Sequence, residues 1–219
     1  MPGLLFWDVD TQHDFMHADG KLYVPGSEAI IPTLGRLTSY AHDKGIRIIA
    51  SADDHVAGHR ELSVHPDFIE TFPPHCMRGT PGQAKIAETA LSNPLVIEPE
   101  PRSSTELAHQ VIAHRGDILF HKHWFDVFTN PNVLPVIRAL DPEAIVLYGV
   151  ALDVCDRYAI EGLARHRPHT RLYFVVDAAR AIRAEQAEHL LKEWAEEGVR
   201  LVRASEILED GVLDGYLNG

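Results

Sequence analysis

The sequence is poor in cysteine, with two in 219 residues, so it cannot carry a network of disulfide bonds. It also lacks a run of about 20 apolar residues, which excludes an ordinary membrane-spanning helix. A charged N-terminal segment followed by a long apolar stretch, typical of secretory signal peptides, is missing as well. These absences favour a cytoplasmic protein with reduced thiols.

Positive charge is scarce too. Twenty lysines and arginines stand against 32 aspartates and glutamates, for a formal net charge of −12 at pH 7. Nucleic acids and anionic membranes are bound through basic patches, so we expect neither as a partner. The hydrophobic content of 45% and the charged content of 24% are ordinary for a globular protein. Length and composition together predict a single domain over residues 1–219.

Strand-like and helix-like patterns alternate along the chain. Apolar runs predict strands at residues 4–9, 46–50, 117–121, 144–148, 172–176 and 199–202. Amphipathic periodicity predicts a helix that Ser27 caps and Gly45 ends, and further helices at residues 84–91, 105–113, 132–140, 153–165 and 184–197. The alternation predicts an α/β fold, a three-layer doubly wound sandwich of about six mostly parallel strands with helices on both faces.

Cys155 follows the strand predicted at residues 144–148, where the apolar run breaks at Gly149 and a helix is expected to begin. A thiol in the first turn of a helix meets the positive end of the helix dipole, which favours the nucleophilic thiolate. A free cysteine is also commonly a small buried packing residue. The segment alone leaves both interpretations open.

Four residues with reactive or charged side chains come just after the ends of four different predicted strands: Asp10, Asp53, Lys122 and Cys155. Ligands of open parallel sheets bind at the carboxyl ends of the strands, so we expect these side chains to meet in one pocket. Asp8 lies on the same face of its strand as Asp10. Such carboxylates either cap the following loop or act as a general base beside a nucleophile.

A long segment rich in histidine, proline and glycine, residues 56–82, has no clear period. Loops of this length inside a compact domain are usually functional. Asp53 and His55 precede it and His75 lies near its end, and two histidines with one carboxylate suit Zn²⁺ or Fe²⁺. Glu61 or His59 is a candidate fourth ligand. The alternative interpretation is a polar, solvated loop.

Aromatic side chains near these groups are candidates to line a slot for a flat ring. They are Phe15, Phe72, Trp124 and Phe125. Each of them alone is equally compatible with a place in the hydrophobic core.

Taken together, these residues resemble the isochorismatase-like cysteine hydrolase superfamily, and within it the nicotinamidase branch. The segments that carry the resemblance are residues 10–15 (Asp-Thr-Gln-His-Asp-Phe), 53–55 (Asp-Asp-His), 72–82 (Phe-Pro-Pro-His-Cys-Met-Arg-Gly-Thr-Pro-Gly) and 149–155 (Gly-Val-Ala-Leu-Asp-Val-Cys). Lys122 sits where the family lysine follows a strand. The match covers most of the chain, with the motifs in the family's order.

The resemblance implies a role for each matching residue. Cys155 is implied as the nucleophile, Asp10 as the base that takes its proton, and Lys122 as the third member of the triad. The backbone N–H groups of Ala151 and Cys155 are implied as the oxyanion hole, with a cis peptide bond between Val150 and Ala151.

The same resemblance implies a divalent metal held by Asp53, His55 and His75, with zinc favoured over Fe²⁺ and Mn²⁺. The metal would anchor a pyridine ring nitrogen or a water, and Phe15 and Phe72 would sandwich the ring. An assembly of identical copies is consistent with this superfamily, although no sequence feature requires one.

The implied activity is that of a cysteine-dependent amidohydrolase that converts nicotinamide to nicotinate and ammonia through a thioester. Several residues depart from the family pattern: Leu152, Asp54, Phe72 and Asp156. These departures leave open another small amide, a carbamate or a ureido compound as substrate of the same triad. Two further hypotheses are a phosphatase that uses Asp8 and Asp10, and a non-catalytic binding domain.

Overall fold

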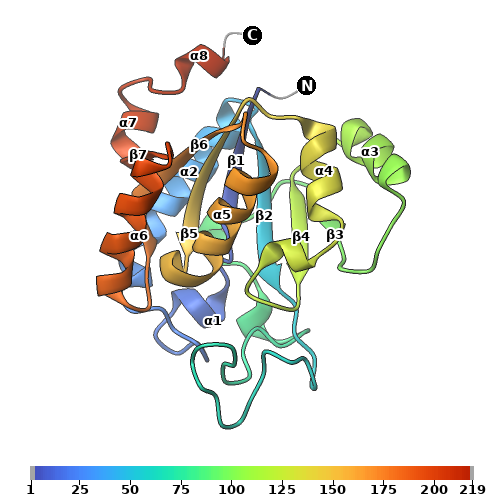
Figure 1. The fold of residues 1–219 in the computed structure, drawn as a ribbon, viewed down its shortest axis with the longest axis vertical. Helices are drawn as coiled ribbons and strands as arrows, with labels where there is room; N and C mark the ends of the chain where they lie inside the picture. The colour runs from blue at the N-terminus through green and yellow to red at the C-terminus, as the bar shows by residue number, and fades with distance from the viewer. Residues whose placement is uncertain (1–2, 218–219) are drawn as a thin grey trace.

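The computed structural model describes residues 3–217, in which seven strands form one parallel sheet between two layers of helices (Figure 1). The strands lie in the order β3-β4-β2-β1-β5-β6-β7. Their bounds are β1 (Leu4–Val9), β2 (Arg47–Asp53), β3 (Leu95–Ile97), β4 (Ile118–Lys122), β5 (Ala144–Val150), β6 (Arg171–Arg180) and β7 (Arg200–Val202). The predicted three-layer α/β class is confirmed.

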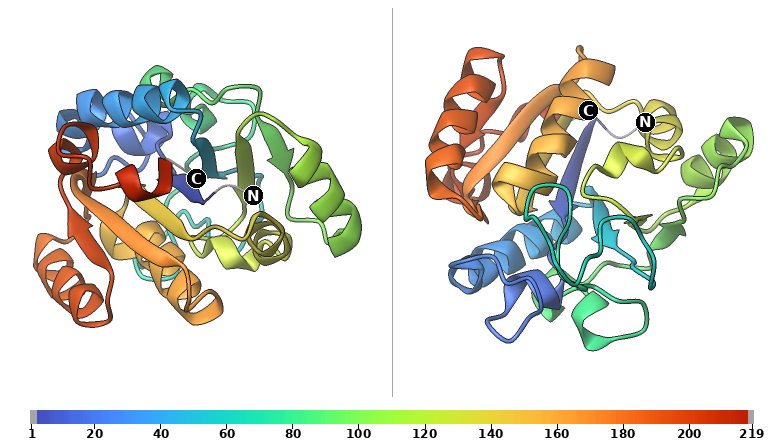
Figure 2. Two further views of the ribbon diagram at one scale, coloured as in Figure 1. Left: turned by 90° about the horizontal axis from the view of Figure 1, so that it is seen from above. Right: turned by 60° about the horizontal axis from the view of Figure 1, so that its bottom comes forward.

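Helices cover both faces of the sheet (Figure 2). One face packs against α3 (Ser104–Ala113), α4 (Val133–Leu140), α5 (Arg157–His166) and α6 (Ala184–Glu196). The other packs against α2 (Ile31–Asp43) and α7 (Ala204–Leu208). Two short helices, α1 (His13–Met16) and α8 (Asp214–Leu217), complete the fold. Successive side chains of β1 alternate between the two cores, with Leu5 and Trp7 in one and Leu4 and Phe6 in the other.

Two sequence-based predictions of local structure were wrong, and one strand was missed. The segment at residues 84–91 holds only a short 3₁₀ turn, Ala87–Thr89, because backbone hydrogen bonds to the chain after β1 keep it extended. Ser27 does not cap α2, since its hydroxyl donates to the carbonyls of Phe15 and Met16. The edge strand β3 was missed, because a partly exposed three-residue strand carries almost no periodic signal.

The order of the strands in the sheet determines where the site lies. β1 lies at the centre, with β2 on one side and β5 on the other, so its carboxyl end marks the switch point of the sheet. The long connection from β2 to β3 passes across this edge of the sheet, at the bottom of Figure 1 and in front in the right view of Figure 2. Among the described residues, no helix has both the length and the apolar character needed to cross a bilayer.

Candidate active site

Asp10, Lys122 and Cys155 meet at the switch point. Lys122 Nζ lies 2.9 Å from Asp10 Oδ2 and 3.8 Å from Cys155 Sγ. The Asp10 and Lys122 side chains are fully buried, and Cys155 is 8% exposed. Asp10 has a left-handed backbone (φ 50°), which is costly for a residue with a side chain, and Ser51 Oγ donates to its Oδ1 at 2.6 Å. The structure thus assembles the three side chains that the sequence placed on separate strands.

The electrostatics of the three groups are set first by burial. Burial raises the pKa of the Cys155 thiol well above its usual value, and the Lys122 ammonium only partly offsets this effect. The thiol lies in a five-residue π-helical turn, Leu152–Asp156, that runs directly into α5, so Cys155 stands at the start of a helix as the sequence predicted. Because the resting thiol stays protonated, a nucleophilic role needs a base within reach.

Asp10 has the properties of such a base. Burial raises the pKa of Asp10, while the Lys122 ammonium lowers it, and the net direction is upward. The nearby Asp10 carboxylate also contributes to the raised pKa of the Cys155 thiol. Burial disfavours the charged form of Lys122, yet the Asp10 and Asp53 carboxylates outweigh it and raise the pKa of that amine well above its usual value. Lys122 is consequently a fixed positive charge beside the thiol.

Gln12 and Asp14 are residues to which the sequence analysis assigned no role. Gln12 Oε1 accepts from the Asp53 N–H at 2.7 Å, and Gln12 Nε2 donates to the Asp53 carbonyl at 2.8 Å. Asp14 Oδ2 accepts from the backbone N–H of Cys76 at 2.7 Å. These bonds fasten the loop after β1 to the chain around two predicted metal ligands. Both residues stand in the family-like segment at residues 10–15, which is the signal that could have revealed them.

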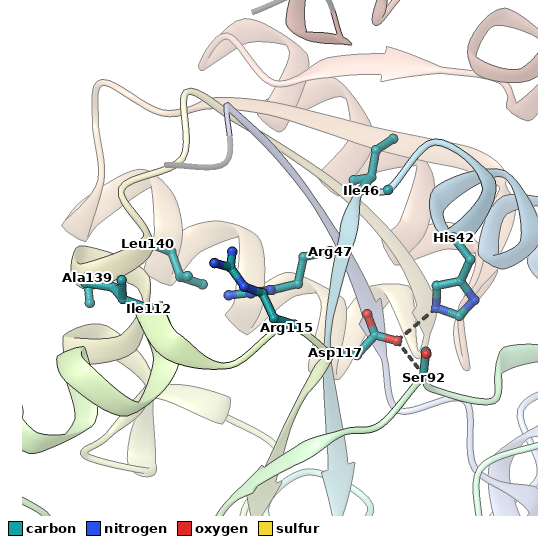
Figure 3. Close-up of a pocket in the computed structure, with 11 residues that line it drawn as sticks. His42, Ile46, Arg47, Ser92, Ile112, Arg115, Asp117, Ala139 and Leu140 are labelled. Atoms are coloured by element: carbon teal, nitrogen blue, oxygen red, sulfur yellow. Dashed lines mark hydrogen bonds and ion pairs between the residues drawn. The ribbon is translucent and has the colours of Figure 1, made fainter.

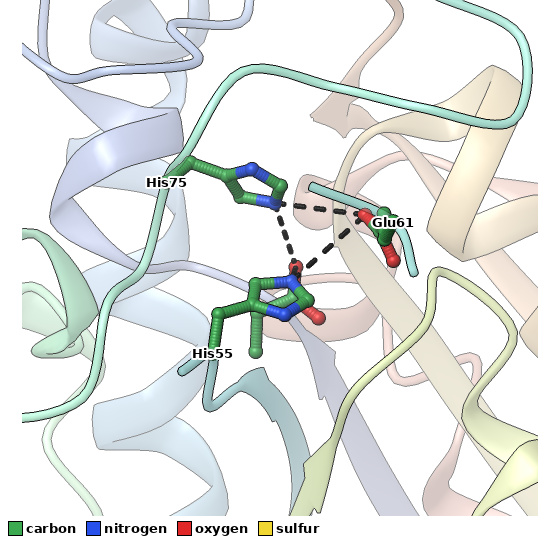
Figure 4. A group of neighbouring side chains, drawn as sticks. His55, Glu61 and His75 are labelled. Atoms are coloured by element: carbon green, nitrogen blue, oxygen red, sulfur yellow. Dashed lines mark ion pairs between the residues drawn. The ribbon is translucent and has the colours of Figure 1, made fainter. Parts of the chain in front are cut away.

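Four buried side chains from β2 and the following loop form a compact cluster (Figure 4). They are Asp53, His55, Glu61 and His75, and their ligand atoms all lie within 4.8 Å of one another. His75 Nε2 lies 3.4 Å from Asp53 Oδ2 and 3.6 Å from Glu61 Oε1. The corresponding distances from His55 Nε2 are 3.9 Å and 4.0 Å.

The donor set of this cluster fits a divalent cation. His55 Nε2, His75 Nε2 and Glu61 Oε2 are buried and have no hydrogen-bond partner within the part of the chain that the structure describes. Unpaired polar atoms that converge in a buried space are costly unless an ion or water satisfies them. Two imidazole nitrogens and two carboxylates suit Zn²⁺, Fe²⁺ or Mn²⁺.

The pKa shifts of Glu61 and His55 agree with this fit, whereas burial of His75 is outweighed by the Asp53 carboxylate, which raises the pKa of His75. Burial raises the pKa of Glu61 to about 7 and lowers the pKa of His55 to about 4. Burial also opposes ionisation of Asp53, but Lys122 and the two histidines hold the pKa of Asp53 below its usual range. A neutral imidazole is the form that binds a metal, and a cation would relieve the cost of a buried Glu61 carboxylate.

His59, the other candidate for the fourth ligand, lies outside the cluster. Its Nδ1 is 3.2 Å from His55 Nδ1, on the ring edge that faces away from the shared centre. Its ring packs on that of His123, with centroids 4.2 Å apart. His59 therefore contacts the outer edge of the His55 ring and is not a member of the ligand cluster.

A narrow, mostly apolar cavity connects Cys155 to the cluster. Phe15 and Phe72 line it together with Phe125, Leu22, Val24, Val154 and Ile182, and its polar lining comes from Asp53, Glu61 and His75. Trp124, which was predicted to line the slot, does not. The Arg60 guanidinium lies 3.7 Å from the centroid of the indole ring, so Trp124 packs outside and its neighbour Phe125 faces the cavity instead.

The backbone between β5 and Cys155 has the expected unusual feature. The peptide bond between Val150 and Ala151 is cis, as the resemblance implied. Ala151 lines the cavity beside Cys155. Two departures from the family pattern are buried and do not enter this lining: Leu152 joins the hydrophobic core, and burial raises the pKa of Asp156 well above its usual value. A neutral Asp156 adds no negative charge next to the thiol.

The arrangement of Asp8 disfavours the phosphatase hypothesis. Asp8 is buried, accepts a hydrogen bond from Thr11 Oγ1 at 2.8 Å and pairs with Lys85 Nζ at 2.8 Å. Asp8 is therefore occupied by Thr11 and Lys85, whereas Asp10 pairs with Lys122, whose ammonium also lies next to Cys155.

Comparisons with known proteins agree with this architecture. The isochorismatase domain model matches residues 4–206. The chain is 26% identical over 200 residues to the nicotinamidase/pyrazinamidase of Mycobacterium tuberculosis, covering 90% of this chain and 97% of that protein. It is 24% identical over 169 residues to the nicotinamidase of Escherichia coli, covering 73% and 76%.

Solved structures share the fold. The pyrazinamidase of Pyrococcus horikoshii in complex with zinc superposes with a TM-score of 0.72 at 22% identity, covering 92% of this chain and 99% of that one. The N-carbamoylsarcosine amidase of Thermoplasma acidophilum gives 0.68 at 20% identity, covering 93% and 97%. Since the domain model spans nearly the whole chain, this protein belongs to the isochorismatase family, and the curated relatives that it resembles are nicotinamidases.

Proposed function

We propose that this protein is a cysteine-dependent amidohydrolase that converts nicotinamide, or a close pyridine carboxamide, to the carboxylate and ammonia. One observation carries the proposal: Cys155 lines a narrow cavity with aromatic walls, and behind its thiol the Lys122 ammonium contacts both Cys155 and Asp10. The buried ligand cluster stands beside the same cavity. The curated relatives with nicotinamidase names support the choice of substrate class.

The acylation half begins with proton transfer from the Cys155 thiol to Asp10, whose raised pKa suits a general base. The thiolate attacks the amide carbonyl carbon, and the backbone N–H groups of Ala151 and Cys155 stabilise the oxyanion. The C–N bond then breaks, Asp10 returns the proton to the departing nitrogen, and ammonia leaves. A thioester on Cys155 remains.

The deacylation half reuses the same groups. Asp10 removes a proton from a water molecule, which attacks the thioester carbonyl. The C–S bond breaks and the proton on Asp10 returns to sulfur. The product leaves as the carboxylic acid and gives its proton to solvent water, which yields the carboxylate. Lys122 stays charged throughout and balances the negative charge that moves between Asp10 and Cys155.

A divalent metal has a defined place in this proposal. Asp53, His55, Glu61 and His75 would hold it. When bound, it would act as a Lewis acid that anchors a ring nitrogen or a water and so orients the substrate. Phe15, Phe72 and Phe125 would enclose the ring between this anchor and Cys155.

Ammonia release from nicotinamide tests the proposal. We expect turnover by the wild type and loss of more than about 10³-fold in Cys155→Ala, as when other catalytic nucleophiles are removed. Cys76→Ala is the matched control: Cys76 is buried, is absent from the cavity lining and should be dispensable. Equal activity of wild type and Cys155→Ala would reject the assignment of the nucleophile. Turnover of carbamates or ureido compounds without nicotinamide turnover would keep the triad and reject the substrate.

A further inference from the structure

A second cavity lies at the opposite edge of the sheet, at the amino ends of β2 and β4 (Figure 3). It has a volume of about 610 Å³, within the range of sites for small organic molecules. The end of α2, the start of β2 and the ends of α3 and α4 surround it. No residue of the proposed active site lines it.

Two guanidinium groups face this cavity. Arg47 donates to the carbonyls of Val111, at 3.1 Å, and His114, and both of these partners are neutral. Arg115 lines the same cavity and has neither a hydrogen-bond nor an ion-pair partner among residues 3–217. Burial lowers the pKa of Arg47, Asp117 opposes this effect, and the charge of Arg115 adds to it. Two cations therefore share one cavity in a chain whose net charge is −12.

The carboxylate of the cavity, Asp117, is already occupied. It accepts hydrogen bonds from the backbone N–H groups of Ile48, at 2.9 Å, and Ser92, at 2.7 Å. His42 Nε2 lies 2.8 Å from its Oδ2. These partners hold Asp117 against β2 and α2 (Figure 3). Within the described residues, Asp117 forms no ion pair with either guanidinium. Its charge is partly offset where it stands, so the arginine side of the cavity remains suited to an anion.

The wall beside the arginines is apolar. Ile46 and Leu140 are buried, while Ile112 is 55% exposed and so offers apolar surface at the cavity rim. An inorganic anion gains nothing from such a wall. An organic anion gains both a bidentate contact with a guanidinium and burial of its carbon body.

We propose that the cavity between Arg47 and Arg115 binds a small organic carboxylate, with the carboxylate held by the two guanidinium groups and the body against Ile46, Ile112 and Leu140. Arg47 is fixed by its carbonyl partners and supplies a preorganised charge. Arg115, which has no competing partner in the described chain, closes on the ligand. This site is independent of the proposed amidase activity.

The test is a titration of the whole protein followed by the backbone amide resonances of Gly45 and Gly116, which line the cavity. The probe is benzoate, which has no ring nitrogen for the metal cluster. We expect saturable shifts of both resonances in the wild type and binding weakened at least about tenfold in Arg115→Gln, because a charged hydrogen-bond donor is lost. Arg165→Gln, an exposed arginine on α5, is the matched control and should bind as the wild type does.

Three results would overturn the proposal. They are no saturable shift in the wild type, equal benzoate affinity in Arg115→Gln, or binding of inorganic phosphate as tight as that of benzoate. The last result would show that the apolar wall is not used. Arg115 is exposed, so Arg115→Gln should keep the wild-type melting temperature, which excludes unfolding as the cause of weaker binding.

Discussion

Lys122 and Asp10 form a fully buried ion pair, with Nζ 2.9 Å from Oδ2 and neither side chain exposed. The same ammonium donates to Asp53 Oδ1 at 2.5 Å, so one charge serves both the proposed base and a proposed metal ligand. Taking charges out of water is tolerated only when they are paired this closely. Lys122 thus links the thiol end of the cavity to the metal end.

Lys122→Met should destabilise the protein strongly, because it leaves two buried carboxylates without a counter-charge. We expect the free energy of unfolding in urea to fall by about 3–5 kcal/mol, the usual cost of breaking a buried pair. Lys192→Met is the control: the Lys192 side chain is 77% exposed and 4.0 Å from Glu196, so it should change stability by less than about 0.5 kcal/mol. Similar stabilities for the two variants would contradict the assigned role of Lys122.

Glu61→Gln should weaken zinc binding, because an amide oxygen replaces one of the two carboxylate ligands in the cluster. Competition with a chromophoric chelator should report a loss of at least about tenfold, the lower bound seen even for outer-shell partners. Glu70→Gln, an exposed change in the same loop, should leave the affinity as it is. Unchanged affinity in Glu61→Gln would remove Glu61 from the ligand set.

The metal-free protein should lose stability as the pH rises, in a way that depends on Glu61. Its pKa is about 7 in the fold against 4.5 for an unperturbed glutamate, so the folded state keeps a proton that the unfolded state releases. This contribution is fully present below about pH 4.5 and is lost as the pH rises through about 7. The shift corresponds to about 3 kcal/mol, as an order of magnitude.

Urea unfolding of the metal-free wild type and Glu61→Gln, measured from pH 4.5 to 8, isolates this effect. His55 and His75 titrate in both proteins, so the difference between the two curves reports Glu61. The wild type should lose stability relative to the variant as the pH rises. Parallel curves would show that the Glu61 carboxyl is not protonated in the fold.

Phe125→Ala and Trp124→Ala test which aromatic side chain contacts the substrate. Phe125 lines the cavity, whereas Trp124 packs under Arg60 outside it. We expect Phe125→Ala to raise KM for nicotinamide by roughly 2–10-fold, the scale of one aromatic contact. Steady-state ammonia release should give Trp124→Ala a KM within about twofold of the wild type. The reverse order would mean that the ring approaches from the Trp124 side.

Strand-end positions made much of this site predictable from the sequence. Asp10, Lys122 and Cys155 each follow a buried apolar run, and the carboxyl ends of parallel strands must share one edge of the sheet. Asp53 and His55 are close in the chain, so their proximity is local. Periodicity likewise predicted six of the seven strands, since buried strands carry a strong apolar signal.

Other features depended on tertiary structure. Glu61 and His59 are equally polar and two residues apart, but the pairing of Leu62 with Phe72 turns only Glu61 toward His75. Phe125 and Trp124 are neighbours in the chain, but only the Phe125 side chain lines the cavity. Residue spacing alone could not predict which of the two would do so. The thiol pKa is governed by burial, a property of the packed molecule. The sequence by itself determined which chemical groups reach the edge of the sheet; packing decided which of them face each other and in which protonation state, because both depend on contacts between distant segments.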